Sequence, residues 1–191
     1  MKSNVKEKLV EAASELFQVQ GIGATGLNEI LQRSGVPKGS LYYYFPEGKR
    51  ALVKAAAENA ARLIREKIRE GLSKEHDPVR AVQCVIAGME EALVREGRLH
   101  NLSISLIALE TYLSDEGIRE LCHQEFLSME QMYASCLREG GIPSPAADQL
   151  GCVIQSLIEG ALILSVTERD SRPLHAAGEQ ITFLIQHGRQ G

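Results

Sequence analysis

Residues 35–46 read GVPKGSLYYYFP and place four aromatic side chains in adjacent positions, from Tyr42 to Phe45. The chain has only five Tyr and four Phe, and no Trp. A phenol hydroxyl donates a hydrogen bond to phosphate, and its ring packs against a sugar or a thymine methyl group. Lys38 can reach a phosphate or the O6 and N7 atoms of guanine. The stretch therefore suits a nucleic acid duplex, although a tyrosine-rich core corner or a protein interface would use the same residues.

The patterns that enzymes and metal sites use are missing from the sequence. The five histidines show no HExxH or similar metal-ligand spacing, and neither a nucleophile elbow nor a phosphate-binding loop is present. The four cysteines, at positions 84, 122, 136 and 152, form no CxxC pair. We therefore expect a protein that is not an enzyme and that holds no metal or cofactor. The thiols are expected to be reduced and buried as small apolar groups, rather than paired in a disulfide or used in redox chemistry.

The composition is typical of a soluble globular protein, with 44% hydrophobic and 24% charged residues among 191. Gln155 and Glu159 interrupt the most apolar stretch, residues 153–166, so we expect no membrane span, and the polar N-terminus has no signal peptide. These features predict a cytoplasmic protein. Residues 1–70 carry 12 Lys and Arg against 8 Asp and Glu, while the remainder is acidic, which favours an anionic partner at the N-terminal end only.

Helical periodicity runs along the whole chain and predicts an all-α fold of about nine helices with no strand. Three helices fill residues 1–48, which we expect to form a helix-turn-helix domain. A fourth helix, over residues 49–72, is the expected connector to a ligand-binding and dimerisation domain in residues 73–191. In that domain, residues 102–113 are apolar on almost every side and are expected to be buried all round.

Glycine and proline mark the ends of the N-terminal helices. Gly21 is expected to end the first helix, Thr25 to cap the second, and Pro37 to stand in the first turn of the third. Residues 34–36, Ser-Gly-Val, form the short turn between the second and third helices. This is the helix-turn-helix pattern, in which the second helix of the pair enters the major groove with its N-terminal residues toward the base edges.

That recognition helix would begin with residues 38–40, Lys-Gly-Ser. The glycine lets the backbone come close to a duplex. Leu41 and Phe45 are four residues apart and should pack inward on the first two helices. The three tyrosines at positions 42–44 should then point outward or sideways, toward a charged groove.

The run from Gly21 to Leu52, GIGATGLNEILQRSGVPKGSLYYYFPEGKRAL, closely resembles the N-terminal DNA-binding domain of the TetR family of transcriptional regulators. The positions that match the family motif are Thr25, Ile30, Gly35, Val36, Lys38, Gly39, Leu41, Tyr42, Phe45 and Pro46, with Ser40 in place of Thr. Pro37 replaces the usual Ser, and Tyr43 and Tyr44 stand where His is common. The segment before Lys49, one residue longer than usual, and the later run IEGALILSVTERDSRPL resemble the LmrA/YxaF-like branch.

The resemblance implies double-stranded operator DNA as the partner. The residues expected to bind DNA are Thr25, Pro37, Lys38, Gly39, Ser40, Tyr42, Tyr43, Tyr44 and Lys49. One helix-turn-helix reads only a half-site, so we expect a homodimer on a palindrome. The resemblance implies an interface built from the last two helices of each subunit; alternatively, those apolar helices complete a monomer core.

The middle helices are expected to enclose a pocket for a small hydrophobic effector. The candidates for its lining are Met89, Leu106, Leu109, Glu110, Tyr112, Phe126, Met129, Tyr133, Gln155 and Glu159. Each of them could instead be ordinary core. Glu110 and Glu159 lie inside apolar runs, where a carboxylate could meet a cationic ligand or be satisfied by a neighbour.

These expectations combine into one predicted function, a ligand-responsive transcriptional repressor that its effector releases from DNA. A transcriptional activator of the same fold, and a helical small-molecule-binding protein without DNA binding, are the alternatives.

Overall fold

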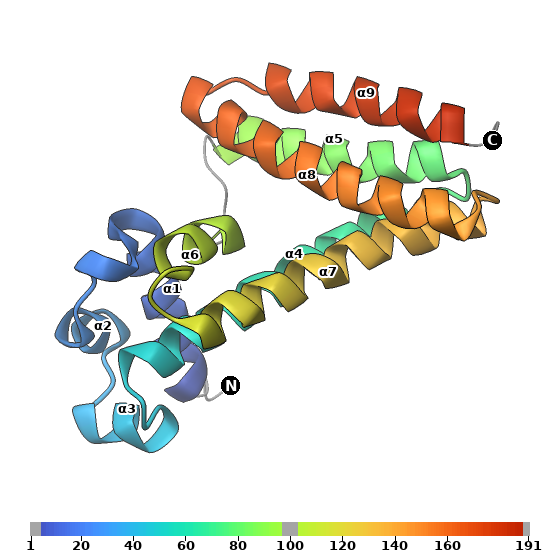
Figure 1. Ribbon diagram of the computed structural model, residues 1–191. Helices are drawn as coiled ribbons and strands as arrows, with labels where there is room; N and C mark the ends of the chain where they lie inside the picture. The colour runs from blue at the N-terminus through green and yellow to red at the C-terminus, as the bar shows by residue number, and fades with distance from the viewer. Residues whose placement is uncertain (1–4, 97–102, 189–191) are drawn as a thin grey trace. The chain divides into compact units, whose positions relative to one another are not determined.

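A computed structural model describes residues 5–96 and 103–188. These residues form nine α-helices and no strand, which confirms the predicted fold class (Figure 1). The helices divide into two compact units, which are described separately. Unit 1 takes its helices from residues 1–63 and 101–124, and unit 2 takes its helices from residues 64–100 and 125–191.

Unit 1 is built around α1 (Val5–Ala24), which contacts α2 (Leu27–Ser34), α3 (Lys38–Tyr44) and α6 (Ile104–Thr111). It also contains the first part of α4 (Lys49–Leu72) and of α7 (Glu116–Glu139). Its core consists of fully buried side chains from four of these helices, Leu9, Ala13, Phe17, Ile30, Leu41 and Leu52. Burial of this apolar surface is the main force that holds the short helices in place.

The regular part of α1 ends, as expected, at Gly21, whose backbone is left-handed (φ 82°, ψ 163°). The last residues of α1 from Gly21 onward and the two residues before α2, residues 21–26, are here called the α1–α2 connection. The expectation that Thr25 caps α2 is wrong. Gly26 is the N-cap residue, and Thr25 is 1% exposed with its hydroxyl donating to the Gly21 carbonyl at 2.7 Å. The Glu29 carboxylate instead accepts from the Gly26 N–H at 3.0 Å. A side chain in the first turn of α2 therefore satisfies the N–H of the N-cap residue.

The expected all-round burial of residues 102–113 is also wrong. Leu102 lies outside the described residues, and α6 buries Ile104, Ile107 and Thr111 on one face, while Leu109 and Leu113 are 67% and 85% exposed. The physical reason is that this eight-residue helix packs on α1 along one face, so its opposite face stays exposed. The apolar pattern of a helix shows which residues could be buried, but it does not show how many neighbouring helices pack against them.

An ion pair joins the turn after α6 to the start of α4. The Arg50 guanidinium donates to both carboxylate oxygens of Asp115, at 2.5 and 3.0 Å, and also pairs with Glu47. Asp115 in turn accepts from the Ile118 N–H and caps α7. The hydrogen bonds from Arg50, more than its charge alone, lower the pKa of Asp115 from 3.8 to about 2.

Unit 2 consists of α5 (Pro78–Glu96), α8 (Ser144–Glu168), α9 (Arg172–Gly188) and the later parts of α4 and α7. Helix α9 packs along both α8 and α5. The turn from α8 to α9 is held by the buried Ser165 hydroxyl, which accepts from the Leu174 N–H at 3.2 Å. Helix α8 lies against α7 at Gly151, where a Cβ atom would come within 2.6 Å of the Glu130 carbonyl oxygen.

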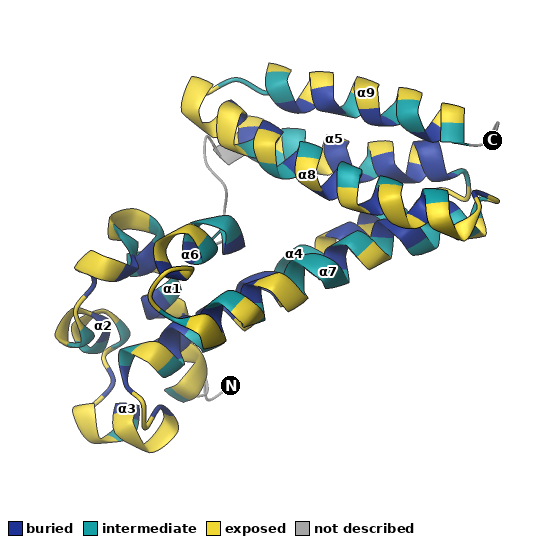
Figure 2. Ribbon diagram, in the orientation of Figure 1, coloured by how far each residue is buried: buried dark blue, intermediate teal, exposed yellow. Residues whose placement is uncertain are grey.

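Helix α8 is apolar on its exposed side as well as its buried side. By length and composition, with a mean hydropathy of 1.7, it could cross a membrane, whereas the sequence predicted no membrane span. A third of that window is buried within the protein. The large apolar side chains left exposed on α8 and α9 are Ile163, Leu164, Val166 and Phe183 (Figure 2). This exposed apolar surface is here called the α8–α9 face.

The cysteines differ in burial. All four are free thiols, and Cys122 is buried, but Cys152 is exposed on α8, so the expectation that every thiol is buried is wrong for that residue. The compact units also place α6 with the N-terminal helices, because it packs on α1. These units reflect packing and not function, so the division into a DNA-binding domain (residues 1–48), a connector (49–72) and a ligand-binding and dimerisation domain (73–191) stays a prediction.

Gly151→Ala should destabilise the protein by about 1–3 kcal/mol, since the added methyl group would meet backbone of α7 that cannot move aside cheaply. The matched control is Gly88→Ala on α5, where nothing lies within 4 Å of the new Cβ and helix propensity alone should stabilise by up to about 1 kcal/mol. Urea unfolding measures both free energies. Equal effects of the two substitutions would refute close packing of α8 on α7.

Asp115→Asn should lower thermal stability at neutral pH, because Arg50 loses an ionised partner. The pKa of Asp115 is depressed in the folded state, so its contribution exists above the ordinary pKa of 3.8 and is lost as the pH falls toward 2. The gap in melting temperature between the two proteins should therefore narrow over that interval. Glu58→Gln, which removes an exposed carboxylate elsewhere on α4, gives the pH dependence caused by one lost charge alone. A gap that stays constant down to pH 2 would contradict the assignment.

Candidate nucleic-acid interface

The pair α2 and α3 has the geometry of a helix-turn-helix. Helix α2 ends at Gly35, which is left-handed (φ 66°) and whose N–H returns to the Leu31 carbonyl at 3.0 Å. Nothing lies within 4 Å of a Cβ atom at Gly35, so glycine is needed there for its backbone and not for space. The buried Val36 and the N-cap residue Pro37 then redirect the chain into α3, because the Pro37 carbonyl accepts from the Ser40 N–H at 3.0 Å.

Helix α3 keeps its aliphatic residues inside and its tyrosines outside, as expected. Leu41 and Phe45 are 0% and 3% exposed, whereas Tyr42, Tyr43 and Tyr44 are 46%, 79% and 39% exposed. The rings of Tyr43 and Tyr44 meet edge to face with centroids 5.0 Å apart. Exposed phenols on one short helix form an amphipathic surface, which presents hydroxyl donors beside apolar ring faces.

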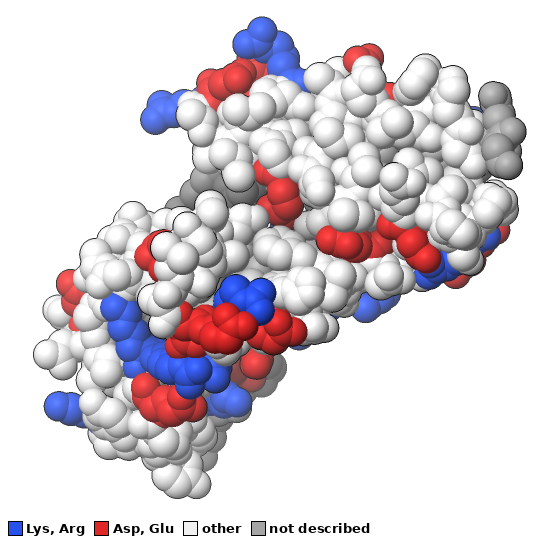
Figure 3. Space-filling view, in the orientation of Figure 1, with Lys and Arg blue, Asp and Glu red and all other residues white. Residues whose placement is uncertain are grey.

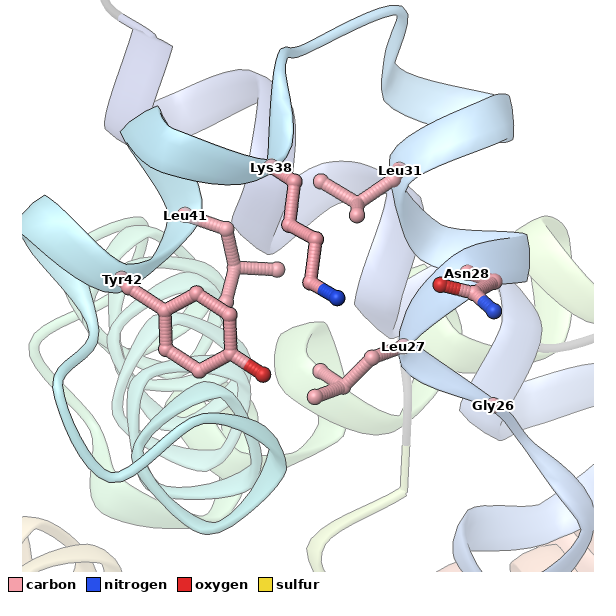
Figure 4. A pocket seen from close by; sticks show the side chains of 7 residues that line it. All are labelled: Gly26, Leu27, Asn28, Leu31, Lys38, Leu41 and Tyr42. Atoms are coloured by element: carbon pink, nitrogen blue, oxygen red, sulfur yellow. The ribbon is translucent and has the colours of Figure 1, made fainter.

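A hollow between α2 and α3 brings together polar groups from both helices. Figure 4 shows the Lys38 ammonium pointing into it from the start of α3, with the Tyr42 hydroxyl and the Asn28 amide on either side. Its apolar floor comes from Leu27, Leu31 and Leu41, and Gly26 completes the lining. A cation, an amide and a phenol around an open depression are groups that hydrogen-bond to phosphate and base edges.

Asn28 was not among the predicted DNA-binding residues. It is exposed in the first turn of α2, opposite Lys38 across the hollow. Its exposed amide can donate and accept, as base recognition requires. The signal that could have found it is a polar residue at the start of the first helix of the motif, directly after the Gly26 that begins it.

The other predicted DNA-binding residues fall into exposed and covered positions. Pro37, Lys38 and Gly39 are exposed and Ser40 is half-buried, so all lie on the accessible part of α3 and its start. Lys49 is half-buried, and its ammonium donates to the Gly23 carbonyl at 3.3 Å. Thr25 is buried, and its hydroxyl donates to the Gly21 carbonyl and accepts from the Gln20 amide.

A negative charge lies close to this surface. The Gly26 N–H and the Gln20 amide both donate to the Glu29 carboxylate, and the Lys49 ammonium adds a favourable charge, so the pKa of Glu29 is lowered. Glu29 is therefore ionised at neutral pH and repels phosphate at the beginning of α2. Figure 3 shows such mixing of acidic and basic groups on the face of unit 1 in view. This surface therefore offers individual donors among mixed charges and not a uniform basic patch.

The predicted effector-binding residues belong to two different units. Leu106, Leu109, Glu110 and Tyr112 are in unit 1, where Leu109 and Tyr112 are exposed on α6 and the residue after it. Glu110 is exposed. Its carboxylate accepts from the Ile22 and Gly23 N–H groups at 2.8 and 3.2 Å, so it is satisfied by a neighbouring segment.

The other predicted effector-binding residues lie in unit 2, namely Met89, Phe126, Met129, Tyr133, Gln155 and Glu159. Four of these form a cluster inside unit 2, here called the Tyr133 cluster, which consists of Met129, Tyr133, Gln155 and Glu159. Gln155 donates to the Met129 sulfur at 3.8 Å and to the Glu159 carboxylate at 2.9 Å. The Tyr133 hydroxyl is fully buried and has no hydrogen-bond partner among the residues that the structure describes. Burial, followed by the charge of Glu159, raises the pKa of Tyr133, so the phenol stays protonated as a donor.

Models of known families match most of the chain. Residues 9–56 match bacterial regulatory proteins of the tetR family, and residues 78–180 match the C-terminal domain of LmrA/YxaF-like transcriptional regulators. The HTH-type transcriptional regulator YxaF of Bacillus subtilis is 39% identical over 181 residues, which are 95% of either chain. LmrA of the same organism is 37% identical over 169 residues, which cover 88% of this chain and 90% of LmrA.

The fold has counterparts among solved structures. The regulatory protein TetR from Rhodobacter sphaeroides superposes with a TM-score of 0.81 over 94% of this chain and 98% of its own, at 21% identity. The relatives are transcriptional regulators and not enzymes, as the sequence predicted. The chain belongs to the TetR family of DNA-binding transcriptional regulators, with a C-terminal domain of the LmrA/YxaF-like branch.

Proposed function

We propose that this regulator is a cytoplasmic, ligand-responsive repressor that binds palindromic operator DNA as a homodimer and is released by a small hydrophobic effector. The observation that carries the proposal is the outward display of three tyrosines and Lys38 on a helix anchored by Leu41 and Phe45. Repression would follow from occupancy of a promoter by the bound dimer.

The proposed DNA contacts divide by their place on α3. Lys38, together with Asn28 across the hollow, is suited to base edges, where an amide and an ammonium discriminate between base pairs. Tyr42, Tyr43 and Tyr44 are suited to phosphate and sugar. Gly39 would allow close approach of the backbone, since nothing lies within 4 Å of the missing Cβ. Of the remaining predicted residues, Pro37 and Ser40 would lie beside the duplex, Lys49 would reach a phosphate, and Thr25 would act only by fixing the backbone.

The proposed dimer interface is the α8–α9 face. Exposed positions on α8 recur every fourth residue at Cys152, Ser156, Gly160 and Leu164, which makes one continuous stripe. Phe183 projects from α9 and its ring stacks on His187 at a centroid distance of 3.9 Å. Figure 3 shows largely uncharged surface over these two helices. Apolar patches of this kind mark protein interfaces, and a second copy explains the hydropathy of α8 without a membrane.

The proposed effector site is the Tyr133 cluster. A buried hydroxyl without a partner costs free energy, which a ligand with a hydrogen-bond acceptor would recover. The carboxylate of Glu159 and the amide of Gln155 would add an acceptor and a donor, and Met129 would adapt to the apolar part of the ligand. Binding could release DNA only to the extent that the ligand prefers the conformation that does not fit the operator.

The double substitution Leu164→Glu with Phe183→Glu should convert a dimer into a monomer, because like charges would face each other across the α8–α9 face. Sedimentation velocity gives the oligomeric state. Binding to a palindrome selected from random-sequence DNA should fall to about the level measured with a single half-site. Val94→Glu, at another exposed apolar position in unit 2, is the control and should stay dimeric. A wild-type protein that sediments as a monomer would defeat the proposal.

Tyr133→Phe should raise the free energy of unfolding of the ligand-free protein by about 1 kcal/mol, because it removes a buried hydroxyl that has no partner. The same substitution should weaken by about tenfold the compound that most raises the melting temperature of the wild type in a screen of hydrophobic molecules. Tyr112→Phe, at an exposed phenol, should change neither quantity. Loss of stability in Tyr133→Phe would show that the hydroxyl has a partner and would remove it from the effector site.

A further inference from the structure

Side chains from three helices hold the α1–α2 connection. From α1, Gln20 donates to the Thr25 hydroxyl at 3.4 Å and to Glu29 at 2.8 Å. From α4, the Lys49 ammonium donates to the Gly23 carbonyl at 3.3 Å. From α6, the Glu110 carboxylate accepts the N–H groups of Ile22 and Gly23. Of these anchors, Glu110 is the one that comes from far along the chain, 88 residues after Ile22.

The backbone geometry explains why a carboxylate is needed at this point. Gly21 is left-handed and interrupts the hydrogen-bond ladder of α1, so the N–H groups that follow it need acceptors from elsewhere. One oxygen of Glu110 takes two successive N–H groups, at 2.8 and 3.2 Å. A Cβ atom at Gly21 would come within 3.1 Å of the other oxygen, so glycine also permits the approach. Charge-assisted bonds of this kind are stronger than neutral ones.

The connection determines the orientation of the helix that follows it. Helix α2 begins at Leu27, packs on α1 and forms one wall of the hollow that contains Lys38. A shift of residues 22–26 would therefore move Asn28 relative to Lys38, across the hollow. Recognition of base edges tolerates little displacement, because hydrogen bonds weaken steeply with distance and angle.

We propose that Glu110 is a positioning residue for operator binding, which acts through the Ile22 and Gly23 amides to hold α2 beside α3. It carries a negative charge, so electrostatics alone predict that its removal strengthens binding to a polyanion. Positioning predicts the opposite sign. The two explanations can therefore be separated by one affinity measurement with a charge-matched control.

The experiment compares wild type, Glu110→Ala, Glu110→Gln and Glu58→Ala on a duplex selected from random-sequence DNA by the wild-type protein. Glu110→Ala should bind about tenfold more weakly, and Glu110→Gln, which keeps one acceptor oxygen, should recover part of the loss. Glu58→Ala removes an exposed carboxylate from α4 and should bind as well as wild type or slightly better. The slope of log affinity against log salt should be unchanged in both Glu110 variants, because neither removes a phosphate contact.

A second readout needs no DNA. Amide hydrogen exchange at Ile22 and Gly23 should be faster in Glu110→Ala, with exchange in α8 and α9 unchanged, since those helices belong to unit 2. If Glu110→Ala fails to fold, the isosteric Glu110→Gln carries both measurements. Wild-type or tighter DNA binding by a folded Glu110 variant would overturn the proposal. Unchanged exchange at the two amides would overturn it equally.

Discussion

A recognition helix of seven residues cannot be stable by itself, and this constraint shapes the DNA-binding unit. Helix α3 holds its shape because Leu41 and Phe45 are buried against its neighbours. Since these two residues occupy one side of so short a helix, the intervening tyrosines have no place inside. The packing that folds the helix is thus the same packing that displays its phenols.

The features that were predictable from the sequence are those in which neighbouring residues determine one another. The outward direction of Tyr43 follows from the spacing of Leu41 and Phe45, and the end of α2 follows from the left-handed preference of Gly35. Each of these depends on a few adjacent positions. The number of helices and the position of the helix-turn-helix are accessible for the same reason.

Two kinds of feature were not predictable. They are the contacts between segments far apart in the sequence and the extent to which neighbouring helices bury an apolar helix. Glu110 was expected either to meet a ligand or to be satisfied by a neighbour, but nothing local identified that neighbour as the Ile22 amide, 88 residues away, and Arg50 pairs with Asp115 across 65 residues. No periodicity encodes such pairs. The exposed Leu109 on α6 shows the second limit, because an apolar pattern does not state how many neighbours a helix will have. The cap at Gly26 shows that a nearby Glu29 can replace a side-chain cap.

Acidic side chains of the DNA-binding unit have partners within the unit itself. The carboxylates of Glu29 and Glu110 accept hydrogen bonds from backbone N–H groups, and Asp115 forms an ion pair with Arg50. Their hydrogen bonds and ion pair stabilise the backbone and helix ends of this unit. Lys38, by contrast, is exposed, and its ammonium points into the open hollow between α2 and α3.

The arrangement of the tyrosines has an optical consequence. The chain has no Trp, so its near-ultraviolet emission comes from five Tyr, three of which are on α3. Of the other two, Tyr133 is enclosed and Tyr112 lies just after α6. Intrinsic fluorescence is therefore weighted toward the helix that would touch a duplex, and the protein carries an unlabelled reporter of its own docking.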